Sequence, residues 1–216
     1  MQLFLINGSG NSRKVQAVIN HLGIEVDYQY LDWLAADHKK PGYLSINPNG
    51  RVPTLRDGDF TLWESNAIMQ YLADRVPGNR LYPTDPRQRA DIARWQSWET
   101  THFNRWLGVL VFETVLKPQF MKQPPDDARV QAALPEMKTF AGVLEAHLEN
   151  RQFLVGDELT LADYSLVQQE SFASAIPFDW NAYPNILSYF ERMRAVPHWC
   201  KTAPRPGEAG RIPKAA

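Results

Sequence analysis

The stretch that most constrains the fold is residues 51–73, RVPTLRDGDFTLWESNAIMQYLA. Two short apolar runs lie on either side of Asp57-Gly58, a dipeptide typical of two-residue hairpin turns because glycine readily adopts their positive φ. After Trp63 the apolar residues change to helical spacing, and Ser65 is placed to cap that helix. This stretch therefore predicts a strand, a tight turn, a second strand and a helix.

The two ends of this unit carry groups that suit a short peptide ligand. A cis bond before Pro53 would leave the Val52 backbone outside the sheet, where it can pair with an extended peptide. Glu64 and Ser65 stand at a helix N-terminus, which favours a carboxylate, and Glu64 can accept from an ammonium group. A ligand with a free α-amino-acid head and a short peptide body satisfies both ends, and glutathione is such a ligand.

The motif V-P-T-L, followed by E-S-N-A-I-x-x-Y-L-A, resembles the glutathione S-transferase family, and the similarity extends over most of the chain. Taken alone, a hairpin followed by a capped helix is also an ordinary structural unit. The other similarities along the chain favour the family. The resemblance implies glutathione as co-substrate and no required metal.

The residues before this unit predict the rest of an α/β domain. Residues 2–6 form a short apolar run, residues 12–22 have helical spacing with Gly23 as the C-cap, and residues 25–31 alternate as a strand. Strand, helix and strand in this order predict a parallel pair with a right-handed crossover. The first domain is therefore expected to be an α/β thioredoxin-like domain.

Beyond residue 76 the pattern changes from mixed to helical. A proline-rich connection precedes helical spacing over residues 87–116, which Pro118, Pro124 and Pro125 are expected to break, and over residues 130–148. Thr160 and Asp163 match a capping box that opens a further helix, and residues from 184 predict a last one. The expected organisation is a thioredoxin-like domain at 1–76, a linker at 77–87, an all-α C-terminal domain at 88–202, and a tail at 203–216 that is flexible or laid over a cleft.

Composition excludes several classes of function. The net charge of −1 provides no basic surface for nucleic acid, and no apolar run approaches the roughly 20 residues that span a membrane. The single cysteine excludes an internal disulfide framework, and His198 and Cys200 lack the further ligands of a metal site. The start of the chain has no basic region typical of a secretory signal, so we expect a cytoplasmic protein.

The resemblance places the catalytic group just after the first strand, where it stabilises the glutathione thiolate. No tyrosine or cysteine lies in this segment, so it is similar to the serine-type, theta- and delta-like bacterial members, in which Ser9 matches the catalytic serine. Asn11 is an alternative because its amide can donate to sulfur, and Ser12 is the third, although it also suits a helix N-cap. The charges of Arg13 and Lys14 are expected to be solvated.

The resemblance also implies the remaining glutathione contacts. A histidine and neighbouring cations are expected to hold the glycyl carboxylate, although Gly50 stands where delta-like members carry a second histidine. The backbone before the proline is expected to pair with the peptide, and the start of the following helix with the γ-glutamyl head. The expected contacts are His38, Lys39, Arg51, Val52, Pro53, Glu64, Ser65 and Asn66.

An electrophile must lie beside the sulfur, and the first long helix supplies apolar candidates for its pocket: His102, Phe103, Trp106, Leu110 and Phe112. The expected function is transfer of the glutathione thiolate to small hydrophobic electrophiles, as in detoxification, by a homodimer. Other glutathione-dependent chemistry (an isomerase, a peroxidase or a dehalogenase) and a non-catalytic binding or regulatory module on the same fold stay open as alternatives.

Overall fold

The computed structural model describes residues 1–214, which form two compact units. The first comprises Met1–Pro83 together with the chain from Ala195 onward, and the second comprises Thr84–Arg194. The last short helix, α10 (Pro197–Cys200), packs against α1 and therefore belongs to the first unit. The sequence had instead predicted a helical domain that continues to residue 202.

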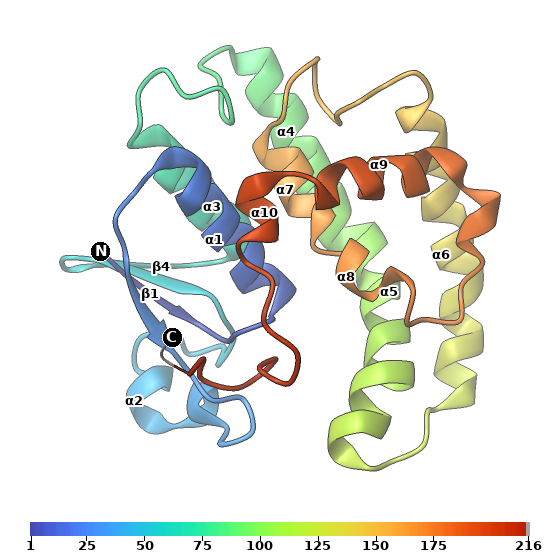
Figure 1. Cartoon of the computed structure of the whole chain (residues 1–216), viewed down its shortest axis with the longest axis horizontal. Helices are drawn as coiled ribbons and strands as arrows, with labels where there is room; N and C mark the ends of the chain where they lie inside the picture. The colour runs from blue at the N-terminus through green and yellow to red at the C-terminus, as the bar shows by residue number, and fades with distance from the viewer. Residues whose placement is uncertain (215–216) are drawn as a thin grey trace. The chain divides into compact units, whose positions relative to one another are not determined.

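The first unit is built on a four-stranded sheet with the order β2-β1-β3-β4 (Figure 1). Strand β1 (Gln2–Leu5) is parallel to β2 (Asp27–Tyr30) and antiparallel to β3 (Thr54–Asp57), which pairs with β4 (Phe60–Trp63). The helices are α1 (Gly10–Leu22), α2 (Pro41–Leu44) and α3 (Ser65–Asp74), with a 3-10 turn at Asp37–Lys39. The predicted thioredoxin-like α/β domain is confirmed.

The alternation of side chains along β1 divides the helices between the two faces of the sheet. Leu3 and Leu5 are completely buried on the face covered by α1 and α3, which pack against each other. Phe4 points to the opposite face, where its ring meets that of Tyr43 on α2 at 6.2 Å. Figure 1 shows the same division, with α2 on the side of the sheet away from α1 and α3.

Two predicted features, the start of the first helix and the hairpin loop, shift by one or two residues. Helix α1 begins at Gly10 rather than at residue 12, directly after a turn in which Gly8 has a φ of 81°. The hairpin loop is Gly58-Asp59, since Asp57 pairs with Phe60. Shifts of this size are usual at the ends of helices, where the last turns fray.

The second unit is entirely helical among its described residues. A continuous helical rod runs through α4 (Pro86–Trp98), a π-helical segment (Glu99–Phe103), α5 (Asn104–Val111) and a second π-helical segment (Phe112–Met121). The remaining elements are α6 (Asp127–Leu148), α7 (Leu161–Val167), α8 (Glu170–Ala173), a 3-10 turn (Trp180–Ala182) and α9 (Pro184–Arg194). Of the three prolines predicted to break this helix, Pro118 lies inside it as part of the π-helical segment, whereas the helix ends at Met121, ahead of Pro124 and Pro125.

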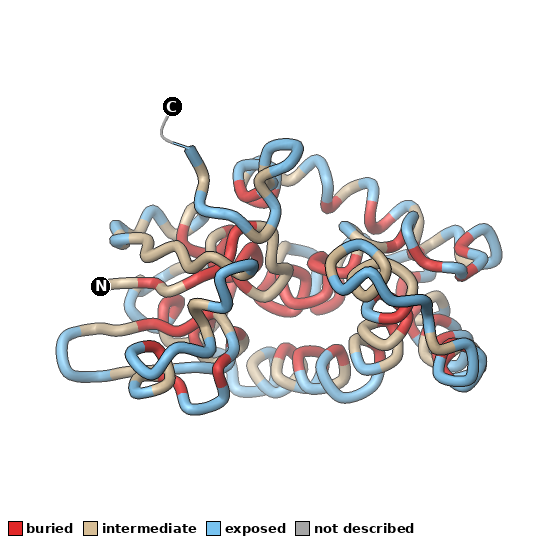
Figure 2. Tube along the Cα trace, turned by 90° about the horizontal axis from the view of Figure 1, so that it is seen from below, coloured by how far each residue is buried: buried red, intermediate tan, exposed pale blue. Residues whose placement is uncertain are grey.

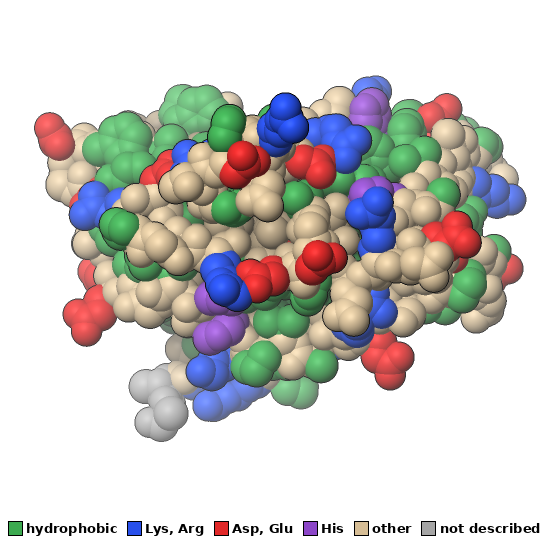
Figure 3. All heavy atoms as spheres, turned by 90° about the horizontal axis from the view of Figure 1, so that it is seen from above, with side chains coloured by type: hydrophobic (Ala, Val, Ile, Leu, Met, Phe, Trp, Pro, Cys, Tyr) green, Lys and Arg blue, Asp and Glu red, His purple; other side chains and the backbone are tan. Residues whose placement is uncertain are grey.

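Burial follows the periodicity read from the sequence. In Figure 2 buried stretches recur along the helices of each unit, whereas the chain beyond residue 203 is mostly exposed or half-buried. The capping box is confirmed: the Thr160 side chain and the Asp163 carboxylate satisfy each other's backbone N–H groups. On the face drawn in Figure 3, acidic and basic side chains are interspersed rather than separated by sign. None of the helices within residues 1–214 has the length and apolarity needed to cross a bilayer.

Candidate functional site

The candidate site begins at the turn that links β1 to α1. The Ser9 N–H donates to the Ile6 carbonyl at 3.1 Å, and Gly8 supplies the positive φ that a type II turn requires at its third position. Ser9 is thereby placed at the N-cap of α1, but its side chain makes no capping bond. Within the described part of the chain its hydroxyl has no hydrogen-bond partner, so it is available to a ligand.

The other two catalytic candidates are already engaged. Ser12 is completely buried, and its Oγ accepts from the Ile6 N–H at 3.4 Å. It is therefore neither the N-cap of α1 nor accessible, because the helix begins two residues earlier and turns Ser12 toward the sheet. Asn11 is half-buried, and its Oδ1 accepts from the Ser65 hydroxyl at 3.2 Å.

Arg13 and Lys14 are buried, so the prediction that both are solvated is wrong. The Arg13 Nε donates to the Thr202 hydroxyl at 3.2 Å, and its guanidinium lies over the Trp199 ring at 3.9 Å from the ring centre. The Lys14 Nζ donates to the Asn66 Oδ1 at 2.9 Å. Packing of α10 and α3 against α1 covers both cations, which the sequence spacing of a single helix could not predict.

Two side-chain pairs connect the first turns of α1 and α3. They are Asn11 with Ser65 and Lys14 with Asn66. The N-terminus of each helix carries free N–H groups and the positive end of its dipole. The two pairs thus bring together two positive helix ends, with the Ser9 hydroxyl at one and Glu64 at the other.

Val52 and Pro53 are joined by a cis peptide bond, in agreement with the sequence-based prediction. Val52 lies outside β3 and is half-buried, whereas Pro53 is buried. Among residues 1–214 the Val52 backbone N–H and carbonyl form no hydrogen bond. They are therefore free to pair with an extended peptide laid beside this segment.

A buried polar network supports the backbone around this cis bond, and sequence reasoning missed it. The Tyr43 hydroxyl and the Asn47 amide both donate to the Arg51 carbonyl, and the Asn47 Nδ2 also donates to the Thr54 hydroxyl at 3.0 Å. The Tyr43 and Thr54 hydroxyls are 2.8 Å apart. The only signal in the sequence was a tyrosine, an asparagine and a threonine close to a Val-Pro pair.

The predicted cationic contacts gather beside Arg51. The Lys39 ammonium donates to the Gly50 carbonyl at 2.8 Å and occupies the space that a side chain at Gly50 would need, because a Cβ there would lie 2.9 Å from Lys39 Nζ. The side chain of a histidine at position 50 would therefore collide with the Lys39 ammonium group. Burial, together with the charges of Lys39 and Arg51, lowers the pKa of His38, so this imidazole is neutral at pH 7.

Glu64 combines exposure with an unusual backbone conformation. It stands at the N-cap of α3 with φ 73° and ψ 110°, a region that costs a non-glycine residue on the order of 1–3 kcal/mol. Ser65, predicted as the cap, is instead the first helical residue and is only 9% exposed. Its side chain is exposed beside the helix N-terminus, where it is accessible to a ligand.

The electrophile candidates in the helical unit divide between its core and its surface. They are His102, Phe103, Trp106, Leu110 and Phe112. Phe103 and Leu110 are completely buried, so the structure assigns them to the core rather than to a pocket wall. His102 is exposed and stacks on Phe140 at 4.9 Å, Trp106 is half-buried, and Phe112 is 38% exposed.

A buried carboxylate missed in the sequence fixes the π-helical segment that carries His102. Glu99 is 1% exposed and accepts hydrogen bonds from the Ser165 hydroxyl at 3.2 Å and from the Gln168 and Gln169 amides at 2.9 and 2.7 Å. These donors come from α7 and the residues that follow it. They satisfy the carboxylate and hold this part of the rod against α7.

The first unit therefore presents a site for a short anionic peptide, with a free hydroxyl where two helix N-termini meet. Residues 1–74 match the N-terminal domain family of glutathione S-transferases, and residues 110–197 match the C-terminal domain family. The chain belongs to the glutathione S-transferase family.

Individual relatives agree with this assignment over nearly the whole chain. A probable glutathione S-transferase GSTF2 of Oryza sativa subsp. japonica is 31% identical over 94% of this chain and 95% of its own length. Glutathione S-transferase 3 of Zea mays is 32% identical over 94% of this chain and 92% of its own length. The crystal structure of a theta class glutathione S-transferase from Xanthomonas axonopodis pv. citri, with glutathione bound, superposes with a TM-score of 0.83 at 28% identity, covering 94% of this chain and 96% of that one.

Proposed function

We propose that the chain binds glutathione in its first unit and transfers the thiolate to small hydrophobic electrophiles. The observation that carries this proposal is the Ser9 hydroxyl, which has no partner in the described chain and stands at the N-terminus of α1. The relatives named glutathione S-transferases support the same activity.

The bound tripeptide would use groups from three parts of the first unit. The Val52 backbone pairs with the peptide portion of glutathione, beside Pro53. Glu64 and Ser65 take the γ-glutamyl head, because one accepts from its ammonium group and the other lies at a helix N-terminus that favours its carboxylate. The glycyl carboxylate lies near His38, Lys39 and Arg51, of which the two cations supply the opposite charge.

The chemical step needs a thiolate at neutral pH. Lowering a thiol pKa by two units from about 8.5 requires about 2.7 kcal/mol of preferential stabilisation of the anion. A hydrogen bond from Ser9 to the sulfur and the dipole of α1 together can supply this amount. The thiol proton leaves to solvent, the thiolate attacks the electrophilic carbon, a C–S bond forms, and the bond to the leaving group breaks with its electron pair.

Several finer assignments belong to this proposal. We infer a serine-type enzyme of the theta- and delta-like bacterial kind, since Ser9 follows the first strand and a theta class structure is similar over 94% of the chain. The chain acts as a cytoplasmic homodimer, without a metal. His102, Trp106 and Phe112 are the members of the electrophile set that retain exposed surface for an apolar substrate.

Three matched variants test the role of Ser9. Turnover of an aryl halide with glutathione at neutral pH is expected to fall at least tenfold in Ser9→Ala, because the thiol loses its hydrogen-bond donor. Turnover is expected to fall less in Asn11→Ala. Ser12→Ala is expected to lower the free energy of unfolding rather than to impair activation of the thiol. Full activity in Ser9→Ala would overturn the assignment. Retention of the unmodified chain on a glutathione matrix without turnover of any electrophile would instead indicate a binding module.

A further inference from the structure

Between residues 203 and 211 the chain forms two consecutive turns, where the sequence predicted a tail at 203–216 that is flexible or laid over a cleft. Residues 215–216 of that tail lie outside the described residues. In the first turn, Arg205–Glu208, the Glu208 N–H donates to the Arg205 carbonyl at 3.0 Å; in the second, Glu208–Arg211, the Arg211 N–H donates to the Glu208 carbonyl at 3.0 Å. Gly207 and Gly210 take the third position of these turns with φ values of 81° and 77°. Pro206-Gly207 is a sequence that favours such a turn. We call residues 203–211 the C-terminal strap.

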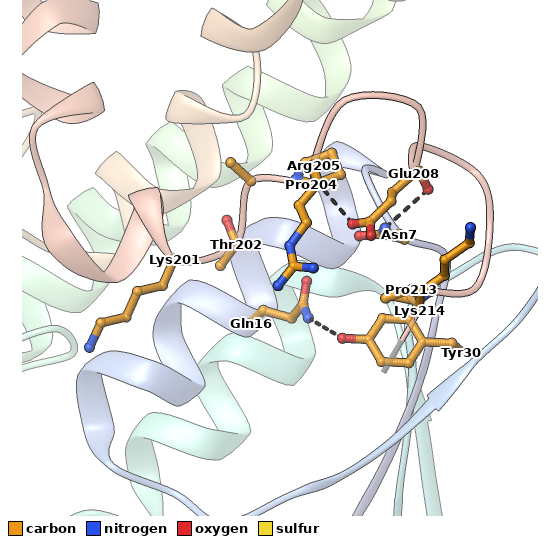
Figure 4. Close-up of a pocket in the computed structure, with 11 residues that line it drawn as sticks. Asn7, Gln16, Tyr30, Lys201, Thr202, Pro204, Arg205, Glu208, Pro213 and Lys214 are labelled. Atoms are coloured by element: carbon orange, nitrogen blue, oxygen red, sulfur yellow. Dashed lines mark hydrogen bonds between the residues drawn. The ribbon is translucent and has the colours of Figure 1, made fainter. Parts of the chain in front are cut away.

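The strap is hydrogen-bonded to the turn that carries Ser9. The Gly210 N–H donates to the Asn7 carbonyl at 2.7 Å, and its carbonyl accepts from the Trp33 N–H at 2.9 Å, so Gly210 joins the chain segments that follow β1 and β2. The Asn7 Nδ2 donates to the Glu208 carbonyl at 3.0 Å, as the close-up in Figure 4 shows. Asn7 is only 8% exposed, so both of its bonds to the strap are largely shielded from water.

The strap also packs directly on the glycine of the same turn. A Cβ at Gly8 would lie 3.1 Å from the Ala209 Cβ and 3.3 Å from the Pro204 Cγ. Asn7 and Gly8 are the two central residues of the Ile6–Ser9 turn. The strap therefore contacts both, Asn7 through hydrogen bonds and Gly8 through packing. Upstream, the strap is anchored through Thr202, whose hydroxyl accepts from Arg13 and donates to the Trp199 carbonyl at 2.7 Å.

From this geometry we propose that the C-terminal strap positions the Ile6–Ser9 turn, so that activation of the glutathione thiol depends on residues at the far end of the chain. Asn7 acts as a positioning residue because it connects the strap to the loop and touches neither the sulfur nor the electrophile. The inference rests on the proposed function. It adds that the C-terminal strap, and not only the N-terminal half of the chain, determines the thiolate fraction.

Truncation separates the strap from the residues that follow it. A chain that ends at Thr202 lacks the strap but keeps α10 and the Arg13–Thr202 bond, whereas a chain that ends at Arg211 keeps every contact described above and serves as the matched control. Gly210→Pro is a second route, because proline has no N–H for Asn7 and cannot adopt a φ of 77°. If the shorter chain does not fold, Gly210→Pro by itself tests whether the strap positions the turn.

Three readouts distinguish positioning from general support of the fold. We expect the pKa of bound glutathione, followed by thiolate absorbance, to rise by about one unit in the strapless chain and in Gly210→Pro. Turnover should then fall about tenfold at pH values below the native thiol pKa and recover at pH values above the raised one. Affinity for S-methylglutathione, which has no thiol to ionise, should stay within about twofold of the control.

The outcomes also separate this inference from the proposed function. If the full chain binds glutathione and forms the thiolate, but loss of the strap changes neither the thiol pKa nor turnover, the inference is wrong and the function stands. A loss of turnover that persists at high pH with an unchanged thiol pKa would also overturn it. If the full chain itself neither binds glutathione nor ionises it, the proposed function fails.

Discussion

Ser65 contributes to the site through two contacts of different kinds. Its backbone opens α3, and its hydroxyl donates to the Asn11 Oδ1 at 3.2 Å across to α1. Because Asn11 is two residues from Ser9, the same hydroxyl connects the predicted head-group site with the predicted thiol site. The distribution of hydroxyls and amides along the sequence identified these residues individually, whereas their pairing depends on how α1 and α3 pack.

Ser65→Ala is expected to weaken glutathione binding by about 1–2 kcal/mol, or roughly five- to thirtyfold, because a hydrogen bond at the head-group site is lost. Its effect on the free energy of unfolding should be smaller. Calorimetric titration with glutathione measures the first effect, and urea unfolding measures the second. Ser45→Ala, at an exposed serine that bonds only its own helix, is the control. An unchanged dissociation constant in Ser65→Ala would exclude Ser65 from the site.

At the scale of elements, a completely buried carboxyl group lies at the start of α7. Asp163 accepts from the Leu154 and Thr160 N–H groups, both at 2.9 Å, and from the Tyr189 hydroxyl at 3.1 Å. Burial nevertheless dominates and raises the pKa of Asp163 to about 6. The capping box was evident from the spacing of Thr160 and Asp163, but the burial that changes its titration comes from α9 and the 154 loop.

The raised pKa of Asp163 predicts in which direction the free energy of unfolding changes with pH. The folded pKa lies above the unfolded value of 3.8, so the contribution of Asp163 is fully present below about pH 4 and is lost as pH rises through about 6. The loss amounts to about 3 kcal/mol at most. In urea unfolding, the stability of the unmodified chain relative to Asp163→Asn should fall over this interval and level above it. The exposed Asp157→Asn is the control, and a difference that does not vary with pH would contradict the assignment.

The first long helix of the second unit contains π-helical segments, which the sequence did not predict. Apolar spacing predicted one helix, and one rod is found, but it contains two π-helical segments. Each extra residue in a π-turn rotates the following side chains around the helix. The sequence pattern does not reveal where such a turn is inserted, because Glu99 and its partners on α7 fix it through tertiary contact.

At the scale of the whole molecule, the proposed homodimer makes a prediction that does not depend on any single residue. Sedimentation equilibrium of the full chain should give twice the chain mass at micromolar concentration. Its melting temperature should rise with protein concentration, because association stabilises only the folded state. A single-chain mass over the entire dilution series, with a melting temperature independent of concentration, would show that the dimer is absent.

Whole-molecule organisation is also where the sequence-based boundaries differ most from the structure. Proline content placed the first boundary at residues 77–87, close to the division after Pro83. The return of the chain to the first unit at Ala195 had no local signal, because Pro197 marks the end of one helix but not the unit against which the next one packs. Only the packing of Trp199 and Thr202 on Arg13 assigns α10 to that unit.

The sequence by itself determined the order of strands and helices in the first unit, the hairpin and the capping box, and it allowed the cis bond at Pro53. Each of these depends on local chemistry: side-chain period, turn glycines, proline geometry and helix capping. Only the tertiary structure decided that Ser9 is free while Ser12 is buried, that Lys14 faces Asn66, and that the strap meets Asn7. These facts depend on which surfaces distant segments bury against each other, and no local pattern along a single chain encodes that.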